Sequence, residues 1–459
     1  MEKLVRLKLF ILVTILGATV LLAEFLRLVV FASQPDVILI TIDTLRADHV
    51  SAYGYKRATT PRIDQLAAES VLFTEAHTVA AWTVPSVVSL LTGLHPLSHG
   101  VNSGLRNWEK AEVLEQPEIP ASLPLLPELM KQAGYKTFGV TENGHLPASL
   151  GFGRGFDFYS NSYFVETLAA HKEITQSPLY HEPGPRFIWI HYYAPHAPYL
   201  AREPWATEWA RAAGTAIDRV PELIDPSGYE KFNYKRGSQE IAALEARYDS
   251  EIRATDEAVR EALESLDPEK KALVILAADH GEEFLDHGNY GHINHYPETA
   301  KIPLLVRYPN HRFAGVRSSR LSSILDIAPT ILTEAGADVP KAFQGAILQD
   351  LGTSPQPDTR ELALHTRRGP GQSSDSLRAV TRMFHHFLGP PKDFDVLYDV
   401  VADPRQEHPP LRDAEQTTEF ASRLAKLEQI YSEAKKAIVQ YKPLSSAEAE
   451  RLKTLGYIN

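Results

Sequence analysis

From Pro35 onward, short apolar runs rich in β-branched residues alternate with segments of helical periodicity, and this alternation limits the possible folds most strongly. It is expected of a mostly parallel β-sheet with helices on both faces. The predicted strands are residues 37–42, 137–140, 187–191, 273–277 and 304–308. Helices are expected at 127–133 and, as a long amphipathic element, at 238–266. The sequence therefore predicts an α/β fold.

The pattern changes after about residue 340. Strand-like runs at 361–365, 378–381 and 396–400 precede a polar-faced helix at 414–441, which indicates a smaller antiparallel C-terminal subdomain. We therefore expect a catalytic domain at 34–340 and a C-terminal subdomain and terminal helix at 341–459. Residues 201–237 look like an irregular insertion, and with residues 102–123 they are expected to shape substrate access.

The first 33 residues have the layout of an export signal. Lys3, Arg6 and Lys8 precede an uncharged run from residue 9 to 23, and no clear A-x-A cleavage site follows it. A retained transmembrane signal anchor is thus favoured over a cleaved signal peptide. Either alternative places the rest of the chain outside the cytoplasm, in the periplasm or the extracellular space. The prediction is a membrane-anchored protein that contacts the membrane through residues 1–33.

Composition narrows the chemistry. A chain of 459 residues with 44% hydrophobic content can bury a large core. Its net charge of -11 argues against a nucleic-acid partner, because such proteins need clustered Lys and Arg. The chain has no cysteine, so any metal must bind to Asp, Glu, His or hydroxyl ligands.

Metal-type ligands follow two of the predicted strands. Asp43 comes directly after strand 37–42, while Asp279 and His280 follow strand 273–277 after one alanine. Either acid alone is typical of a turn or a helix cap. Open α/β sheets, however, bind their ligands at the carboxyl ends of the strands. The two strand ends together therefore predict a metal site.

Thr83 begins a predicted helix at residues 82–93, with Pro85 in its first turn and Gly93 just past its end. One interpretation makes Thr83 an N-cap whose hydroxyl satisfies a backbone N–H. The other makes it a nucleophile beside a tetrahedral anion, which the helix N-terminus would hold.

Longer motifs follow one another in this order: DVILITIDTLRADHVSAYGYKRATTPRIDQLAAESVLFTEAHT, PSVVSLLTGLHPLSHGV, HYYAPHAPY, ADHGEEFLDHGNYGH, IPLLVRYP, LDIAPTILTEAGA and KTLGY. Over nearly everything after residue 35, they resemble the sulfatase family of the alkaline phosphatase superfamily. The resemblance implies an alkaline phosphatase-like α/β fold with a central, mostly parallel sheet flanked by helices. It also implies a metal-dependent hydrolase acting on ester bonds.

The resemblance assigns Asp43, Asp279 and His280 as metal ligands and places Thr83 in the nucleophile position, where it also contacts the metal. Relatives with two zinc ions supply a second site with a further aspartate and two histidines, and this chain shows no D-x-x-x-H run for it. Many relatives also carry an aspartate where this chain has Ala194. A single divalent ion is therefore expected, calcium, manganese or zinc.

Three further histidines match family positions. His145 resembles a histidine that contacts the substrate, and His196 resembles one that acts as acid or contacts the leaving group. His292 lies where many sulfatases carry a catalytic lysine. Arg46, by contrast, is expected to be structural.

Several positions depart from the sulfatase pattern. Sulfatases need C-x-P-x-R or S-x-P-x-R, whose first residue is oxidised to formylglycine, whereas this chain has Thr83-Val84-Pro85-Ser86-Val87. Oxidised threonine would be a ketone, which cannot form the aldehyde hydrate. Asn143 and Thr44 replace a lysine and a second aspartate that are common in sulfatases. These changes favour threonine-dependent branches: phosphodiesterases, phosphonate monoester hydrolases, and transferases of phosphoethanolamine or phosphoglycerol.

Three hypotheses result. In the first, Thr83 attacks a phosphate, phosphonate or sulfate ester without formylglycine, His196 or His292 protonates the departing alkoxide, and water or an acceptor alcohol takes the transferred group. In the second, the chain is a true sulfuric ester hydrolase. In the third, it is an inert relative that binds an anionic ligand. The expected substrate is a phosphorylated or sulfated small molecule, glycan or lipid.

Overall fold

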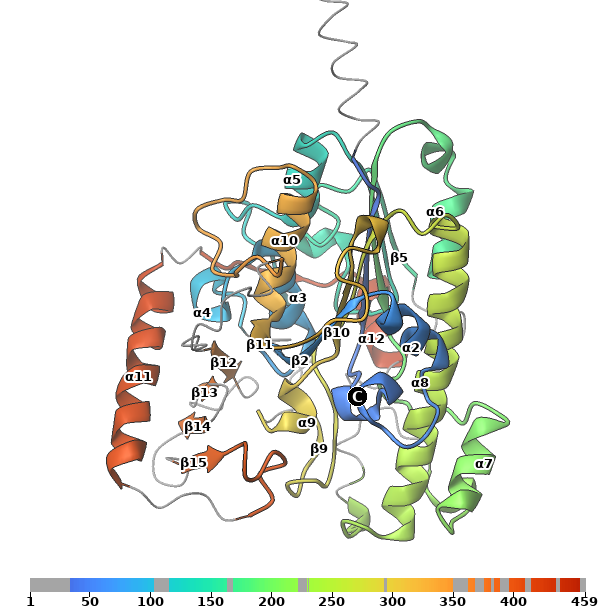
Figure 1. Ribbon diagram of the computed structural model, residues 1–459, viewed down its shortest axis with the longest axis vertical. Helices are drawn as coiled ribbons and strands as arrows, with labels where there is room; N and C mark the ends of the chain where they lie inside the picture. The colour runs from blue at the N-terminus through green and yellow to red at the C-terminus, as the bar shows by residue number, and fades with distance from the viewer. Residues whose placement is uncertain are drawn as a thin grey trace, which may run out of the picture.

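The computed structural model describes residues 34–102, 115–162, 168–221, 229, 231–292, 295–349, 362–367, 375–380, 384–388, 396–408, 414–434 and 438–454 (Figure 1). Its centre is an eight-stranded sheet with the order β11-β2-β10-β7-β1-β6-β4-β5. The strands are β1 (Val37–Ile42), β2 (Val71–His77), β4 (Lys136–Thr141), β5 (Phe158–Asn161), β6 (Arg186–Tyr192), β7 (Leu273–Ala278), β10 (Leu304–Arg307) and β11 (Arg317–Ser323).

Strand β1 lies in the middle of this sheet and pairs in parallel with β6 and β7. Only β10 runs antiparallel to its neighbours, β7 and β2. Every residue of β1 and β7 is buried, which explains their uninterrupted apolar sequences, because both faces of the sheet are covered. All five predicted strands are present. β2, β5 and β11 were not among them.

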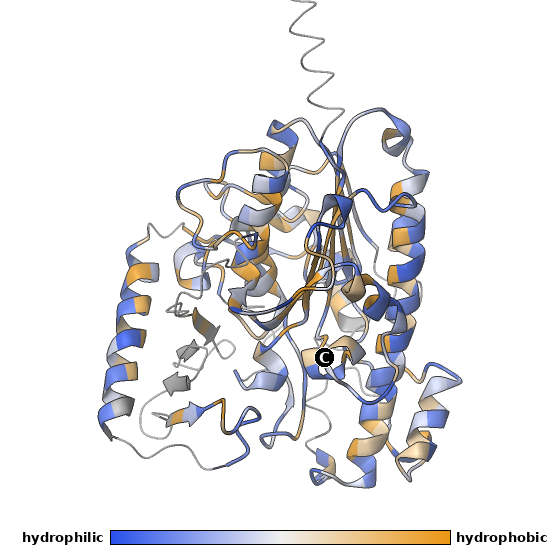
Figure 2. Ribbon diagram, in the orientation of Figure 1, coloured by the Kyte–Doolittle hydropathy of each residue, from blue (hydrophilic) through white to orange (hydrophobic). Residues whose placement is uncertain are grey.

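Helices cover both faces of the sheet (Figure 1). α8 (Gln239–Leu266) packs with α2 (Pro61–Ala68) and α6 (Ala170–Gln176) on one face, and α3 (Thr83–Thr92), α5 (Leu126–Gln132) and α10 (Ile327–Glu334) pack together on the other. Apolar residues concentrate in the strands, while α8 carries hydrophilic residues on its outer side (Figure 2). The predicted α/β fold is confirmed.

The C-terminal part forms the predicted antiparallel sheet with one strand more than expected. Its strands are β12 (Leu362–Arg367), β13 (Asp375–Val380), β14 (Phe384–Leu388) and β15 (Val396–Asp399). The helix beside it, α11 (Ala414–Glu433), ends earlier than predicted. Then β16 (Tyr441–Pro443) pairs with β3 (Glu115–Pro117), and α12 (Ser446–Thr454) follows. The domain boundary near residue 340 stays a prediction.

The insertion at 201–237 is more regular than expected. It contains α7 (Trp205–Ala212), whose Ala206 and Ala210 are buried and which packs against α8. Residues 222–228 and 230 of the insertion lie outside the described residues.

The predicted membrane anchor needs correction. Among the residues that the structure describes, none of the helices has the length and apolar character needed to cross a bilayer. The longest of them, α8, alternates buried apolar positions with charged ones. The expectation of a membrane-anchored protein is therefore not supported, and residues 1–33, on which it depended, lie outside the described residues.

Candidate active site

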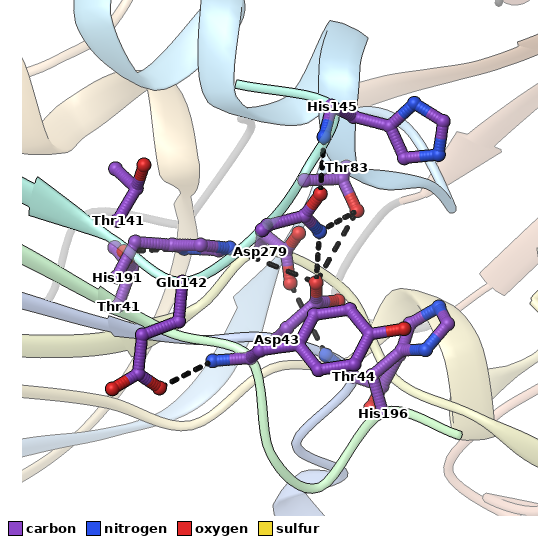
Figure 3. Close-up of polar contacts among 12 residues, drawn as sticks. Thr41, Asp43, Thr44, Thr83, Thr141, Glu142, His145, His191, His196 and Asp279 are labelled. Atoms are coloured by element: carbon purple, nitrogen blue, oxygen red, sulfur yellow. Dashed lines mark hydrogen bonds and ion pairs between the residues drawn. The ribbon is translucent and has the colours of Figure 1, made fainter. Parts of the chain in front are cut away.

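The two predicted strand ends meet at one edge of the sheet. Because β1 and β7 are adjacent and parallel, Asp43 and the pair Asp279 and His280 emerge side by side. All three side chains are fully buried. One candidate ligand atom from each lies within 4.8 Å of the others, so the structure brings together the three predicted metal ligands (Figure 3 shows the two aspartates).

The unused atoms of this cluster fit a divalent cation. Asp43 Oδ1 and Asp279 Oδ2 are buried without a hydrogen-bond partner. His280 Nδ1 lies 2.9 Å from the carbonyl oxygen of Gly281 and donates to it, since a carbonyl only accepts. His280 Nε2 then turns its lone pair toward those oxygens, 3.5 Å from Asp43 Oδ1 and 3.4 Å from Asp279 Oδ2. Two carboxylate oxygens and one imidazole nitrogen suit Mn²⁺ or Zn²⁺, and Ca²⁺ less naturally.

The pKa shifts of the two aspartates also favour a cation at this site. Burial and the neighbouring charge of Asp43 raise the pKa of Asp279 well above its usual value. Burial also opposes ionisation of Asp43, but the surrounding histidines, His191 first, outweigh it and hold the pKa of Asp43 below the ordinary range. Only one of the two carboxyls keeps its charge easily in this dry site. A cation between them would stabilise both in the charged form.

Thr83 is the first residue of α3, and Trp82 rather than Thr83 occupies the N-cap position. The predicted capping role is therefore wrong. Thr83 Oγ1 lies 3.5 Å from each of Asp43 Oδ2, His280 Nε2 and Asn143 Nδ2. The hydroxyl thus faces the candidate metal ligands (Figure 3).

Two residues that sequence reasoning did not assign to the site also contact Asp43. Asn143 follows β4 and donates from Nδ2 to Asp43 Oδ2 at 2.6 Å. His191 stands near the end of β6, with Nε2 3.6 Å from the same oxygen and Nδ1 2.8 Å from Thr41 Oγ1. The available signal was their position, because both lie at strand ends on the edge that carries Asp43.

Thr44, which replaces a common second aspartate, has a different role. Its backbone is left-handed, with φ 54°, and its N–H donates to Asp279 Oδ1 at 3.3 Å. This conformation is costly for a β-branched residue. It leaves Asp279 Oδ2 as the oxygen available to a cation.

Three predicted histidines surround Thr83 and the carboxylates. His196 is 2% exposed, and its Nδ1 donates to the carbonyl oxygen of Ala197 at 2.7 Å. The His292 ring lies 5.2 Å from the ring of His196 and 4.5 Å from that of His280. His145 donates its backbone N–H to Asn143 Oδ1 at 2.8 Å. Burial, and then the charge of His196, lower the pKa of His145 to about 3, so it is neutral at physiological pH.

Arg46 holds the loops next to the site. Its guanidinium pairs with Asp48 and Asp286, each at 2.9 Å, and donates to the carbonyl oxygen of Glu282 at 3.1 Å. These contacts are those of a structural residue, as expected.

The fold and this site define a class of hydrolase that acts on ester bonds within the alkaline phosphatase-like superfamily. The sulfatase family profile matches residues 35–337, which is more than half of the chain. The chain therefore belongs to the sulfatase family. A second profile, that of the C-terminal region of N-sulphoglucosamine sulphohydrolase, matches residues 285–433.

The individual relatives include both sulfatases and phosphonate monoester hydrolases. The ulvan-active sulfatase of Formosa agariphila is 24% identical over 417 residues, covering 82% of this chain and 77% of that protein. A solved structure of another protein, in complex with its substrate D-glucosamine-2-N,6-O-disulfate, superposes on this chain with a TM-score of 0.68 at 20% identity. The match covers 87% of this chain and 98% of the other. The phosphonate monoester hydrolase of Agrobacterium radiobacter superposes with a TM-score of 0.67 at 19% identity, covering 87% and 96%.

Proposed function

We propose that this chain hydrolyses an anionic ester by direct attack of Thr83 Oγ1, without formylglycine, and that phosphate and phosphonate esters are its preferred substrates. The main support for this proposal is the position of Thr83 Oγ1, which lies 3.5 Å from Asp43 Oδ2 and 3.5 Å from His280 Nε2. A threonine can act only as a hydroxyl nucleophile here, because its oxidation product is not an aldehyde.

Asp43, Asp279 and His280, together with the Thr83 hydroxyl, would hold one divalent ion, calcium, manganese or zinc. Such an ion lowers the pKa of the hydroxyl and offsets charge on the ester oxygens. Thr83 is also the first residue of α3, so the N-terminal end of this helix lies at the site and favours an anion there.

The residues divide the remaining work. Thr83 Oγ1 forms a bond to phosphorus as its proton passes toward Asp43 Oδ2, which accepts the Thr83 hydrogen bond. The bond to the leaving oxygen breaks, and His196 or His292 gives that oxygen a proton. His145, neutral and beside Asn143, contacts the substrate. Attack by water on phosphothreonine then releases phosphate and restores Thr83; an acceptor alcohol in place of water would make the reaction a transfer.

A sulfate ester is the second candidate substrate. The activities of two relatives favour it, since the Formosa protein is an ulvan-active sulfatase and one structural neighbour was solved with a disulfated glucosamine. A sulfated glycan would then take the place of the phosphorylated substrate, with Thr83 transiently sulfated.

The deciding experiment is a panel of aryl phosphate, aryl phosphodiester, aryl phosphonate and aryl sulfate substrates. The purified protein is assayed with Mn²⁺, Zn²⁺ or Ca²⁺, with and without an acceptor alcohol. We expect phosphoryl or phosphonyl turnover that Thr83→Ala lowers by about 10³-fold or more, whereas Thr83→Ser retains part of it.

The other outcomes separate the alternatives. Aryl sulfate turnover far above that of phosphates would assign the sulfatase activity instead. No turnover of any substrate, together with protein that binds none of the three ions, would show an inert relative. Turnover that survives in Thr83→Ala would reject the nucleophile.

A further inference from the structure

Glu282 is fully buried two residues beyond His280, and both of its carboxylate oxygens have a partner. Oε2 accepts a hydrogen bond from the Tyr199 hydroxyl at 2.9 Å, and Oε1 lies 3.0 Å from His292 Nδ1. The side chain of Glu282 is 0% exposed and that of His292 is 19% exposed. Burying a carboxylate is costly, and these two contacts offset part of that cost.

The backbone fixes where this carboxylate lies. The N–H groups of Gly281 and Glu282 donate to the carbonyl oxygens of Thr299 and Glu298, at 2.9 and 3.1 Å. A Cβ on Gly281 would lie 1.9 Å from the Glu298 oxygen, so only glycine permits this close approach. Arg46 holds the Glu282 carbonyl oxygen from the other side, at 3.1 Å. Glu282 is thus anchored independently of the histidine that it contacts.

The contact determines which nitrogen of His292 carries a proton. A carboxylate only accepts hydrogen bonds, so Nδ1 must be the protonated nitrogen that donates to Oε1. In the neutral ring Nε2, on the opposite edge, is then the basic nitrogen. The ring lies beside both His280 and His196, at 4.5 and 5.2 Å between centroids, so His292 belongs to the cluster around Thr83.

We propose that Glu282 is a positioning residue for His292, fixing its Nδ1–H tautomer and turning Nε2 toward the substrate bound at Thr83. The kinetic consequence of this inference rests on the proposed function, whereas the tautomer of His292 does not. The Glu282 carboxylate and the His292 imidazole thus act as an oriented pair.

Three variants of the full chain test the proposal. Glu282→Met keeps the length of the side chain but removes both acceptors. Glu282→Gln keeps one acceptor oxygen for His292 Nδ1, and its amide can still meet the Tyr199 hydroxyl. Glu283→Gln is the matched control, because this neighbouring buried acid accepts the backbone N–H groups of His287 and Asn289 instead.

We expect Glu282→Met to lower kcat by about 10²-fold, with KM and Mn²⁺ affinity within about threefold of the parent. Glu282→Gln should retain kcat within about tenfold, and Glu283→Gln should leave it unchanged. Nitrogen-15 NMR of the ring should show Nδ1–H for His292 in the parent and in Glu282→Gln, and a mixture of tautomers in Glu282→Met.

The proposal is overturned if Glu282→Met retains kcat, if its kcat and Mn²⁺ affinity fall in parallel, or if His292 carries its proton on Nε2 in the parent. A parent enzyme without Thr83-dependent turnover would instead refute the proposed function. The NMR result would then decide the positioning role alone.

Discussion

Two sides of the space around Thr83 differ in how they handle charge. On the metal side, Asp43, Asp279 and His280 are fully buried. Each aspartate has one carboxylate oxygen available to a cation, and His280 has one imidazole nitrogen. On the histidine side, His145, His196 and His292 bring ring nitrogens that hydrogen bonds to neighbouring groups orient. In the proposed function, the metal side holds a fixed charge, whereas His196 or His292 on the histidine side gives a proton to the leaving oxygen.

The difference has a functional consequence. Replacing a residue on the metal side should remove ion binding and activity together, whereas replacing one on the histidine side should remove activity alone. Thr83 and Asn143 lie between the two sides, since Asn143 donates both to Asp43 and to Thr83.

The largest effect is expected for Asp279→Asn on the metal side. Loss of this ligand should weaken Mn²⁺ binding by more than about 100-fold, beyond the effect of an outer-sphere change, and lower kcat/KM by about 10³-fold. In the presence of a chelator the variant should be at least as heat-stable as the parent, because the neutral amide avoids both the burial of a charge and the repulsion by Asp43 that raise the pKa of Asp279. Calorimetric titration with Mn²⁺, activity assays and thermal unfolding measure the three quantities.

Asp218→Asn, at an exposed position, is the matched control for Asp279→Asn and should change none of the three. Wild-type Mn²⁺ affinity in Asp279→Asn would mean that the cluster is not the metal site.

His196→Asn tests the histidine side. The asparagine amide can keep the hydrogen bond to the Ala197 carbonyl oxygen but has no counterpart of Nε2. We expect kcat to fall by about 10²-fold with Mn²⁺ affinity unchanged. Because the lost group would protonate the leaving oxygen, the defect should shrink for aryl esters whose phenols are more acidic. An equal defect for all leaving groups would transfer the acid role to His292.

Asn143→Leu probes the boundary between the two sides. Without the 2.6 Å hydrogen bond from Nδ2, the Asp43 carboxylate is no longer held in the orientation that presents Oδ1 to the ion, so both Mn²⁺ affinity and kcat should fall by about 10-fold. Parallel titration and kinetic measurements check this. Lower activity at unchanged affinity would place Asn143 on the histidine side alone.

The metal side was largely predictable from sequence, and the reason is the sheet. Continuous apolar runs fixed β1 and β7 almost to the residue, and adjacent parallel strands must deliver the residues that follow them to one edge. Thr83 was assigned to the correct helix end but to the wrong position, N-cap instead of first residue, because sequence signals leave helix ends uncertain by a residue or two.

The contacts that orient these groups could not be predicted. That Asn143 reaches Asp43, or Glu282 reaches His292, depends on strand order and on side-chain directions in the folded chain. Two of the missed strands of the central sheet are polar or short: β11 has the sequence RSSRLSS with an irregular pattern of exposure, and β5 has four residues. The expected anchor had a clear composition but lies outside the described residues, and the described helices give it no support.

The smallest effect concerns another buried acid, Glu142, which precedes Asn143. Its Oε2 accepts a hydrogen bond from the Tyr193 N–H at 3.3 Å, while Oε1 is buried without a partner. Burial raises the pKa of Glu142 from 4.5 to about 8, so it stays protonated at neutral pH. Asp43 differs because histidines surround its carboxylate, which shows that burial alone does not keep a charge at this edge.

Glu142→Gln should therefore stabilise the protein in a pH-dependent way. Between pH 4.5 and about 8 the unfolded carboxyl is ionised while the folded one is still protonated, so the parent loses stability as the pH rises through this window. The glutamine variant has no such loss. Its midpoint of thermal unfolding should match the parent near pH 4 and exceed it increasingly up to about pH 8, by a few degrees at most, with no further gain above that. A difference that stays constant with pH would show that Glu142 is ionised in the folded protein, and that the edge of the sheet tolerates a third negative charge without a cation.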